Sequence, residues 1–247
     1  MDGSIVSYAL HYGGILIEAA LIIYVVWGRR LKSALTPTFY VAFLLVADLG
    51  RSCVLHLHGL ASRQYFYVYW STDFLLLIAA FLLVCLFFRR ACLHEEKMWR
   101  SVRLLLVFIF ILVMAISCVT FSRHYGHLFT YFIIEFNQNL YFTCLVLNTL
   151  LYLLLQQIDS ADDQLGLLVC GVGIQFAGPA ATLALVHLTS GQGFAQSLAY
   201  FAMPLCNLGM LLVWACAIVH VKDKAIQVTR REIPILAEVT ANLNIQI

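Results

Sequence analysis

Charged side chains are scarce in this sequence. Asp, Glu, Lys and Arg make up 11% of its 247 residues, whereas they make up about 25% of an average soluble domain. Hydrophobic residues make up 62%, mean hydropathy is +0.89, and several uncharged runs approach the ~20 apolar residues that cross a bilayer. The composition excludes a soluble globular protein and predicts a polytopic membrane protein.

The motifs of common enzymes are also missing. The sequence contains no G-x-S-x-G of serine hydrolases, no H-E-x-x-H of zinc hydrolases and no glycine-rich phosphate-binding loop. A retinal protein needs a lysine in its seventh span for the Schiff base, and the lysines stand elsewhere, at Lys32, Lys97, Lys222 and Lys224. We therefore expect no enzymatic activity, no retinal and no nucleic-acid partner.

Ligands for a metal or a haem form no strong pattern. The eight cysteines show no C-x-x-C spacing, and all but Cys92 fall in apolar runs, so we interpret them as small hydrophobes. Most histidines fall near the predicted outer helix ends, at His11, His56, His58, His124, His127 and His187. We expect no cofactor, and the alternative is a metal or haem held by such histidines at the outer face.

Seven apolar stretches are long enough to span a bilayer, and the connections between them are too short to fold separately. They are Tyr8–Trp27, Thr36–Leu57, Phe66–Phe88, Leu104–Phe121, Phe129–Leu155, Leu165–Leu188 and Phe194–Val221. The fourth has no group more polar than Ser117, Cys118 and Thr120, so we expect it to face lipid. The glycines of the sixth permit close helix packing. The sequence thus predicts an all-α bundle of seven transmembrane helices.

The basic residues give the expected orientation, because Lys and Arg in short loops stay on the cytoplasmic side. Most of the 15 basic residues fall in the first loop, the third loop and the C-terminal tail. All three segments lie on one side of a seven-helix chain. We therefore expect an outside N-terminus, a cytoplasmic C-terminus and a cell inner membrane as the location.

The chain divides into a membrane domain, residues 1–221, and a tail, residues 222–247. The tail is basic and ends in strict apolar and polar alternation from Val239 to Ile247, which is the period of a strand. A lone strand has no sheet to join in an all-helical chain. We expect the tail either to be disordered or to add a strand to a partner's sheet.

Ionisable groups at membrane depth are costly, so each is a functional candidate. Five occur in the spans, and amides at helical spacing extend them into polar stripes that should face one another inside the bundle. The predicted lining of an outward-facing polar cavity is Glu18, Asp48, Arg51, Asp73, Glu135, Gln138, Asn139, Gln175 and Asn207.

Four carboxyls in this set face one arginine, Arg51. A fully ionised set would carry an excess negative charge that a low-dielectric interior does not sustain. Three solutions are open: some carboxyls are protonated, a cation or cationic ligand sits among them, or two of them reach the outer surface. A purely structural interpretation is an Asp48–Arg51 pair with protonated carboxyls that hold helices together.

The run Arg63-Gln-Tyr-Phe-Tyr-Val-Tyr-Trp70 opens an apolar third helix, and Asp73 follows a few residues beyond its Tyr-Trp pair. With the basic third loop and four further helices, this arrangement resembles bacterial seven-helix inner-membrane proteins that have no assigned activity. The resemblance covers most of the chain by helix pattern. It implies the topology and a bacterial inner membrane, and it carries no site residues.

Three functions are compatible with these features. The first is a receptor-like or sensory protein, in which a small ligand or ion in the outer cavity is coupled to a cytoplasmic protein partner through the third loop and the tail. The second is a non-catalytic integral subunit or scaffold of a larger membrane complex. The third is a proton- or cation-coupled transporter, which would also need acids in the inner halves of the helices. The lipid bilayer is a partner in all three.

Overall fold

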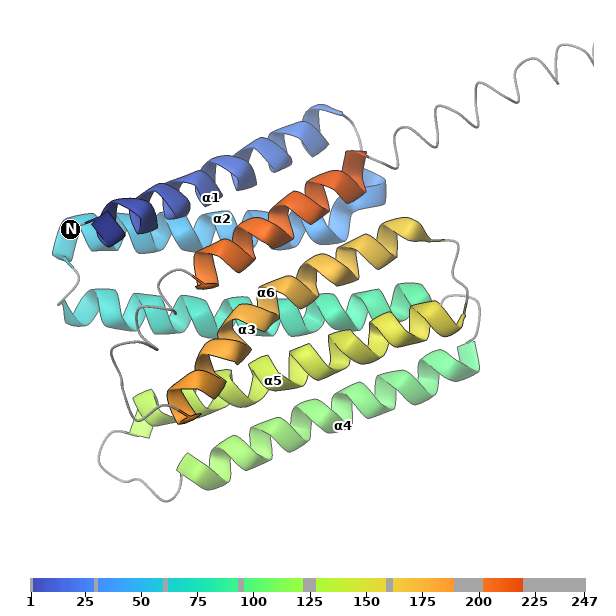
Figure 1. Cartoon of the computed structure of the whole chain (residues 1–247). Helices are drawn as coiled ribbons and strands as arrows, with labels where there is room; N and C mark the ends of the chain where they lie inside the picture. The colour runs from blue at the N-terminus through green and yellow to red at the C-terminus, as the bar shows by residue number, and fades with distance from the viewer. Residues whose placement is uncertain are drawn as a thin grey trace, which may run out of the picture.

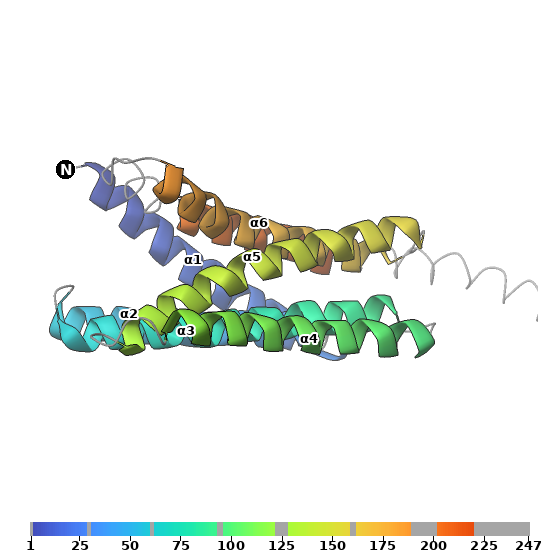
Figure 2. The same cartoon turned by 90° about the horizontal axis from the view of Figure 1, so that it is seen from below.

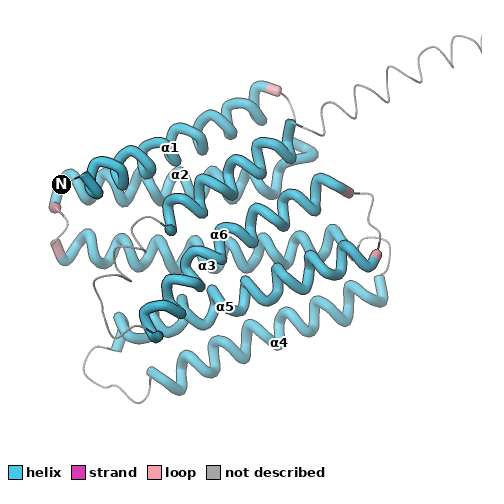
Figure 3. Tube along the Cα trace, in the orientation of Figure 1, coloured by secondary structure: helices cyan, strands magenta, loops and turns pink. Residues whose placement is uncertain are grey.

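The computed structural model describes residues 2–28, 31–59, 62–92, 96–121, 128–158, 162–188 and 202–219. Within these ranges all regular secondary structure is helical (Figure 3). The helices are α1 (Asp2–Trp27), α2 (Leu31–His58), α3 (Arg63–Ala91), α4 (Glu96–Phe121), α5 (Leu128–Gln157), α6 (Asp163–Leu188) and a last helix, Ala202–Val219. All seven are long and apolar enough to cross a membrane, so the prediction of a seven-helix chain is confirmed.

Some predictions concern residues outside these ranges. The whole tail, residues 222–247, lies outside the described residues, as do His124 and His127. His187 belongs to α6, but its side chain is not among those described.

Successive helices run in opposite directions (Figure 1). Neighbours in the bundle include α1 with α2, α2 with α3, α3 with α5, α4 with α5, and α5 with α6. Seen from below, α2, α3 and α4 form one layer, and α6 lies in the other (Figure 2). Helices α1 and α5 cross between the layers.

Capping side chains fix where two of the helices begin. Ser62 precedes α3, and its hydroxyl oxygen accepts a hydrogen bond from the Tyr65 N–H at 3.1 Å. Asp162 precedes α6, and one carboxylate oxygen accepts from the Leu165 N–H at 3.1 Å. The other oxygen of Asp162 lies 2.9 Å from Nη2 of Arg90, near the end of α3. The end of α3 is therefore held beside the start of α6.

Helix α6 and the last helix approach each other closely because α6 has glycines at the contact. Trp214 is fully buried, and its Nε1–H donates to the Leu168 carbonyl at 2.9 Å. A Cβ on Gly171 would lie 2.6 Å from the Trp214 ring, and one on Gly178 would lie 2.8 Å from Sγ of Cys206. The expectation that these glycines serve packing agrees with this contact.

Helix α4 lies at the edge of the bundle, where it packs mainly on α5 (Figure 1). It exposes a continuous set of apolar side chains, Leu104, Leu105, Val107, Phe108, Ile111, Leu112, Ile116 and Val119. An apolar surface of this kind in water would be an aggregation site, whereas a bilayer covers it. Length, composition and exposed surface are together those of a multi-pass membrane protein.

Candidate functional site

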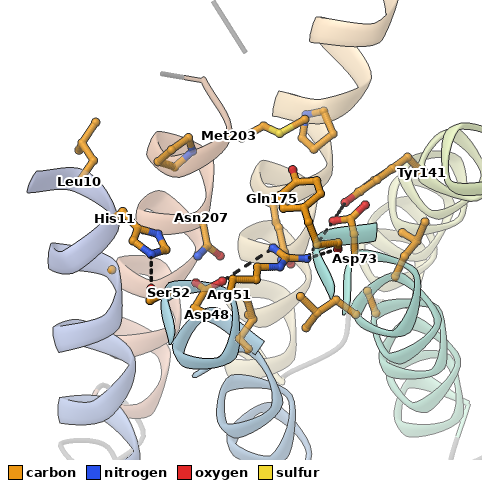
Figure 4. A pocket seen from close by; sticks show the side chains of 18 of the residues that line it. Leu10, His11, Asp48, Arg51, Ser52, Asp73, Tyr141, Gln175, Met203 and Asn207 are labelled. Carbon is orange, nitrogen blue, oxygen red and sulfur yellow. Dashed lines mark hydrogen bonds and ion pairs between the residues drawn. The ribbon is translucent and has the colours of Figure 1, made fainter. Parts of the chain in front are cut away.

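A cavity of about 280 Å³ opens inside the half of the bundle that holds the start of α1. Side chains from α1, α2, α3, α5, α6 and the last helix line it, and none of the described residues of α4 does. Its polar side chains gather around Arg51 (Figure 4). Six helices therefore share one polar space.

Arg51 of α2 reaches across to α3. Its Nε–H donates to Oγ1 of Thr72 at 2.7 Å, and its Nη2 donates to the Tyr69 carbonyl at 3.4 Å. The guanidinium carbon also lies 4.7 Å from the centre of the Tyr69 ring, within range of a cation–π contact. A planar guanidinium satisfies several acceptors at once, and this arrangement holds α2 and α3 together.

Two carboxylates flank the guanidinium group. Oδ1 of Asp48 lies 3.8 Å from Nη1, and Oδ1 of Asp73 lies 3.5 Å from Nη2 (Figure 4). Asp73 accepts further hydrogen bonds, from Nδ2 of Asn137 at 2.9 Å and from the Tyr141 hydroxyl at 3.5 Å. Asp48 receives no hydrogen bond from any described residue beyond this ion pair. The two acids therefore differ: Asp73 is saturated with donors, and Asp48 is not.

Amides from α6 and the last helix complete the inner wall. Nε2 of Gln175 donates to the Tyr40 hydroxyl at 2.8 Å, and Nδ2 of Asn207 donates to Oε1 of Glu18 at 3.4 Å. The oxygens of both amides are buried and have no hydrogen-bond partner among the described residues. The Tyr40 ring also packs edge-on against Trp214. This wall thus rests on the packed contact between α6 and the last helix.

The structure brings together five of the predicted cavity residues, Asp48, Arg51, Asp73, Gln175 and Asn207. Glu18 lies behind Asn207, fully buried, and its second carboxylate oxygen has no partner among the described residues. The other three, Glu135, Gln138 and Asn139, are not among the residues that line the cavity. Asn139 instead donates from Nδ2 to the Ser117 hydroxyl of α4 at 3.4 Å.

The rotation of α5 accounts for this difference. Its buried face follows Ile133, Phe136, Leu140, Cys144 and Leu147, so Asn137 and Tyr141, at i and i+4, point to Asp73. The predicted residues Glu135, Gln138 and Asn139 stand one or two positions away in the sequence from Asn137 or Tyr141, so they lie on another side of α5. The buried apolar period of α5 was the sequence signal that could have placed Asn137 and Tyr141.

Histidines and hydroxyls at the cavity mouth pair with one another across α1 and α2. His11 and Ser52 share a hydrogen bond of 3.0 Å, and both line the cavity. Tyr12 and His56 share another of 3.0 Å on the exposed side. No three His, Cys, Asp or Glu residues in the described ranges lie close enough to hold a metal ion.

The cavity can offer a ligand the Asp48 carboxylate as an acceptor, and Nη1 of Arg51 and the Tyr69 hydroxyl as donors, because neither of these donors has a hydrogen bond among the described residues. Comparison of the chain with protein-family models, curated proteins and solved structures found no match in any of the three. The function is therefore argued from the geometry of the cavity.

Proposed function

We propose that this chain is a receptor-like membrane protein that binds a small ligand or ion in the cavity around Arg51 and couples its occupancy to a cytoplasmic partner. The observation that supports the proposal is the shared lining, in which six helices contribute to one polar space. A ligand there touches most of the bundle at once. It can favour one arrangement of the helices in proportion to its different affinity for the alternatives.

The contacts of Arg51 are the interactions between helices that a bound ligand would strengthen or weaken. Its hydrogen bond to Thr72 and its ion pairs with Asp48 and Asp73 join α2 to α3 inside the cavity. A ligand that competes for one of these carboxylates changes the strength of that connection. Helix α3 then carries the change to its far end, where Arg90 pairs with Asp162 before α6.

The distribution of basic residues supports an orientation with the N-terminus outside. The end of α3 and the start of α4 carry Arg89, Arg90, Lys97, Arg100 and Arg103, and such segments are retained in the cytoplasm. In this orientation the cavity faces outward and the third loop faces the cytoplasmic partner. The resemblance in helix pattern favours a bacterial inner membrane.

Neighbouring glycines in α1 allow a test that needs no known ligand. Gly14 lines the cavity and Gly13 does not, and a Cβ on either would have no atom within 4 Å. Gly14→Leu therefore directs a side chain toward the cavity from a position where its Cβ meets no other atom, and Gly13→Leu is its matched control. Both substitutions remove a helical glycine, so their effects on helix propensity are alike.

The measurement is amide hydrogen exchange of the purified protein at the far end of the bundle, over residues 85–92 and 162–168. We expect Gly14→Leu to change exchange there by about twofold or more, because occupancy of the cavity shifts local opening equilibria. Gly13→Leu should leave it at the wild-type rate. Identical exchange in both variants would show that the cavity is not coupled to the cytoplasmic end, and the sensory proposal would fail.

A further inference from the structure

We infer that the ligand of this cavity is a compact organic cation, an amine whose ammonium group sits against Asp48. The inference rests on the proposed function and adds the chemical class of the ligand. It begins from the Asp48 carboxylate, which faces the cavity and lies 3.8 Å from Nη1 of Arg51.

Asp48 is the acceptor of the cavity that a ligand can reach. The amide oxygens of Gln175 and Asn207 also have no partner among the described residues, but they are too deeply buried for a ligand in the cavity to touch them. Asp48 faces the same cavity with only a long ion pair, 3.8 Å, to Arg51. A ligand with N–H donors would pair with this carboxylate. An ammonium group carries three such donors in a compact head.

The cationic side chain of the cavity is only partly available. Arg51 donates through Nε to Thr72 and through Nη2 toward the Tyr69 carbonyl and Asp73, whereas Nη1 has no hydrogen bond among the described residues and lies 3.8 Å from Asp48. A carboxylate or phosphate ligand that reached Nη1 would lie beside two acids. The arrangement therefore disfavours an anion.

The balance of charge points the same way. Asp48 and Asp73 line the cavity with a single arginine, and Glu18 lies behind Asn207. His11, the other ionisable nitrogen base on the wall, shares a hydrogen bond with Ser52 and also interacts electrostatically with Asp48. An uncompensated carboxylate at low dielectric is costly, and a bound cation offsets that cost.

The rest of the lining is apolar and fits a small hydrocarbon body. Leu44, Leu76, Leu77, Ala80 and Phe176 face the cavity together with several tyrosines. A volume of about 280 Å³ is close to the lower end of the range for small-molecule sites, which starts near 300 Å³. These walls would bury the body of an amine, and the rings of Tyr65 and Tyr69 can attract its charged head.

The experiment uses three probes of one shape: cyclohexylamine, cyclohexanol and cyclohexanecarboxylate. Each is titrated at pH 7 against the full-length protein in mild detergent, with the shift of the unfolding temperature as the readout of binding. At this pH an alkylamine is protonated, as a lysine side chain is. We expect only the amine to raise the unfolding temperature in a saturable way.

Asp48→Asn keeps the shape of the side chain and removes its charge. We expect it to weaken amine binding by about tenfold or more, because a hydrogen bond between charged groups is lost. The matched control is Glu96→Gln at the exposed start of α4, which should leave the affinity unchanged. The result for Asp48→Asn is interpreted only if this variant elutes as the wild-type protein does. Gly14→Leu, which blocks the cavity and leaves Asp48 in place, provides a second test.

Each outcome decides between the two proposals. Equal binding of the alcohol or the carboxylate, or amine binding that survives Asp48→Asn, would overturn the cation assignment and leave the cavity a ligand site. Amine binding that survives Gly14→Leu would place the amine elsewhere and overturn the assignment as well. If none of the three probes binds, the assignment fails, and the hydrogen-exchange experiment alone judges the sensory proposal.

Discussion

Arg51 is the residue on which the polar interior depends. Its guanidinium group meets a hydroxyl, a carbonyl, two carboxylates and an aromatic ring, which come from both α2 and α3. No other basic side chain in the described spans has such a set of partners. The shape of the group matters here as much as its charge, because a planar fork presents donors in several fixed directions.

Replacing this group by an ammonium gives the first prediction at this scale. Arg51→Lys keeps the positive charge but cannot reach Thr72, Asp48 and Asp73 together, so buried acceptors lose their donors. We expect the free energy of unfolding to fall by about 1–3 kcal/mol. Thermal unfolding in detergent measures it.

Arg90→Lys is the matched control for that substitution. Arg90 pairs with Asp162, and both side chains are about one-third exposed. An ion pair open to solvent contributes under about 1 kcal/mol, so this variant should unfold close to the wild-type temperature. If Arg51→Lys behaves in the same way as Arg90→Lys, the guanidinium network is not a structural element of the cavity.

Sequence reasoning at the residue scale found the acids and the arginine and missed their partners. Asp48, Arg51 and Asp73 stand out because charge is rare in apolar helices. Tyr40 and Thr72 do not stand out, since a tyrosine or threonine in a membrane helix is ordinary. Only the three-dimensional contacts single them out.

At the scale of the helix, the sequence predicted the lengths and the number of the helices, but it did not predict how α5 is rotated about its own axis. Length follows from the bilayer, which requires about 20 apolar residues. Rotation depends on which apolar face packs on protein, and in a chain that is 62% hydrophobic both faces look alike. Glu135, Gln138 and Asn139 on α5 were assigned to the cavity for this reason, whereas the structure turns Asn137 and Tyr141 toward Asp73.

Helix packing gives a prediction of its own at Gly171. A methyl group there would lie 2.6 Å from the ring of Trp214, whose Nε1–H is tied to the Leu168 carbonyl. Gly171→Ala must push α6 and the last helix apart, at a cost of about 1–3 kcal/mol in the free energy of unfolding. Gly166→Ala is the matched control, because its Cβ would have no atom within 4 Å.

The control should be as stable as the wild-type protein or up to about 1 kcal/mol more stable, since alanine is the better helix former. Thermal unfolding of the two variants side by side gives the comparison. Equal stability of both would mean that α6 and the last helix do not approach each other as closely as Trp214 requires.

On the scale of the whole molecule, the two ends of the bundle differ in chemistry. One end holds the cavity, with histidine, tyrosine and serine at its mouth. The other holds the Arg90–Asp162 pair and the basic start of α4. A polar cavity at one end and basic segments at the other are compatible with the proposed sensory function. That proposal depends on the orientation of the bundle across the membrane.

The orientation is itself open to a direct test. Alkaline phosphatase folds to an active form only outside the cytoplasm, so its fusion after Gly59 should be active and its fusion after Cys92 inactive. The physical reason is that Arg89, Arg90 and the basic start of α4 resist translocation across the membrane. Replacing Arg89, Arg90, Arg100 and Arg103 together by Gln should raise the activity of the second fusion. Activity after Cys92 in the unmodified sequence would invert the bundle, place the cavity mouth in the cytoplasm and turn the proposed receptor into a sensor of the cell interior.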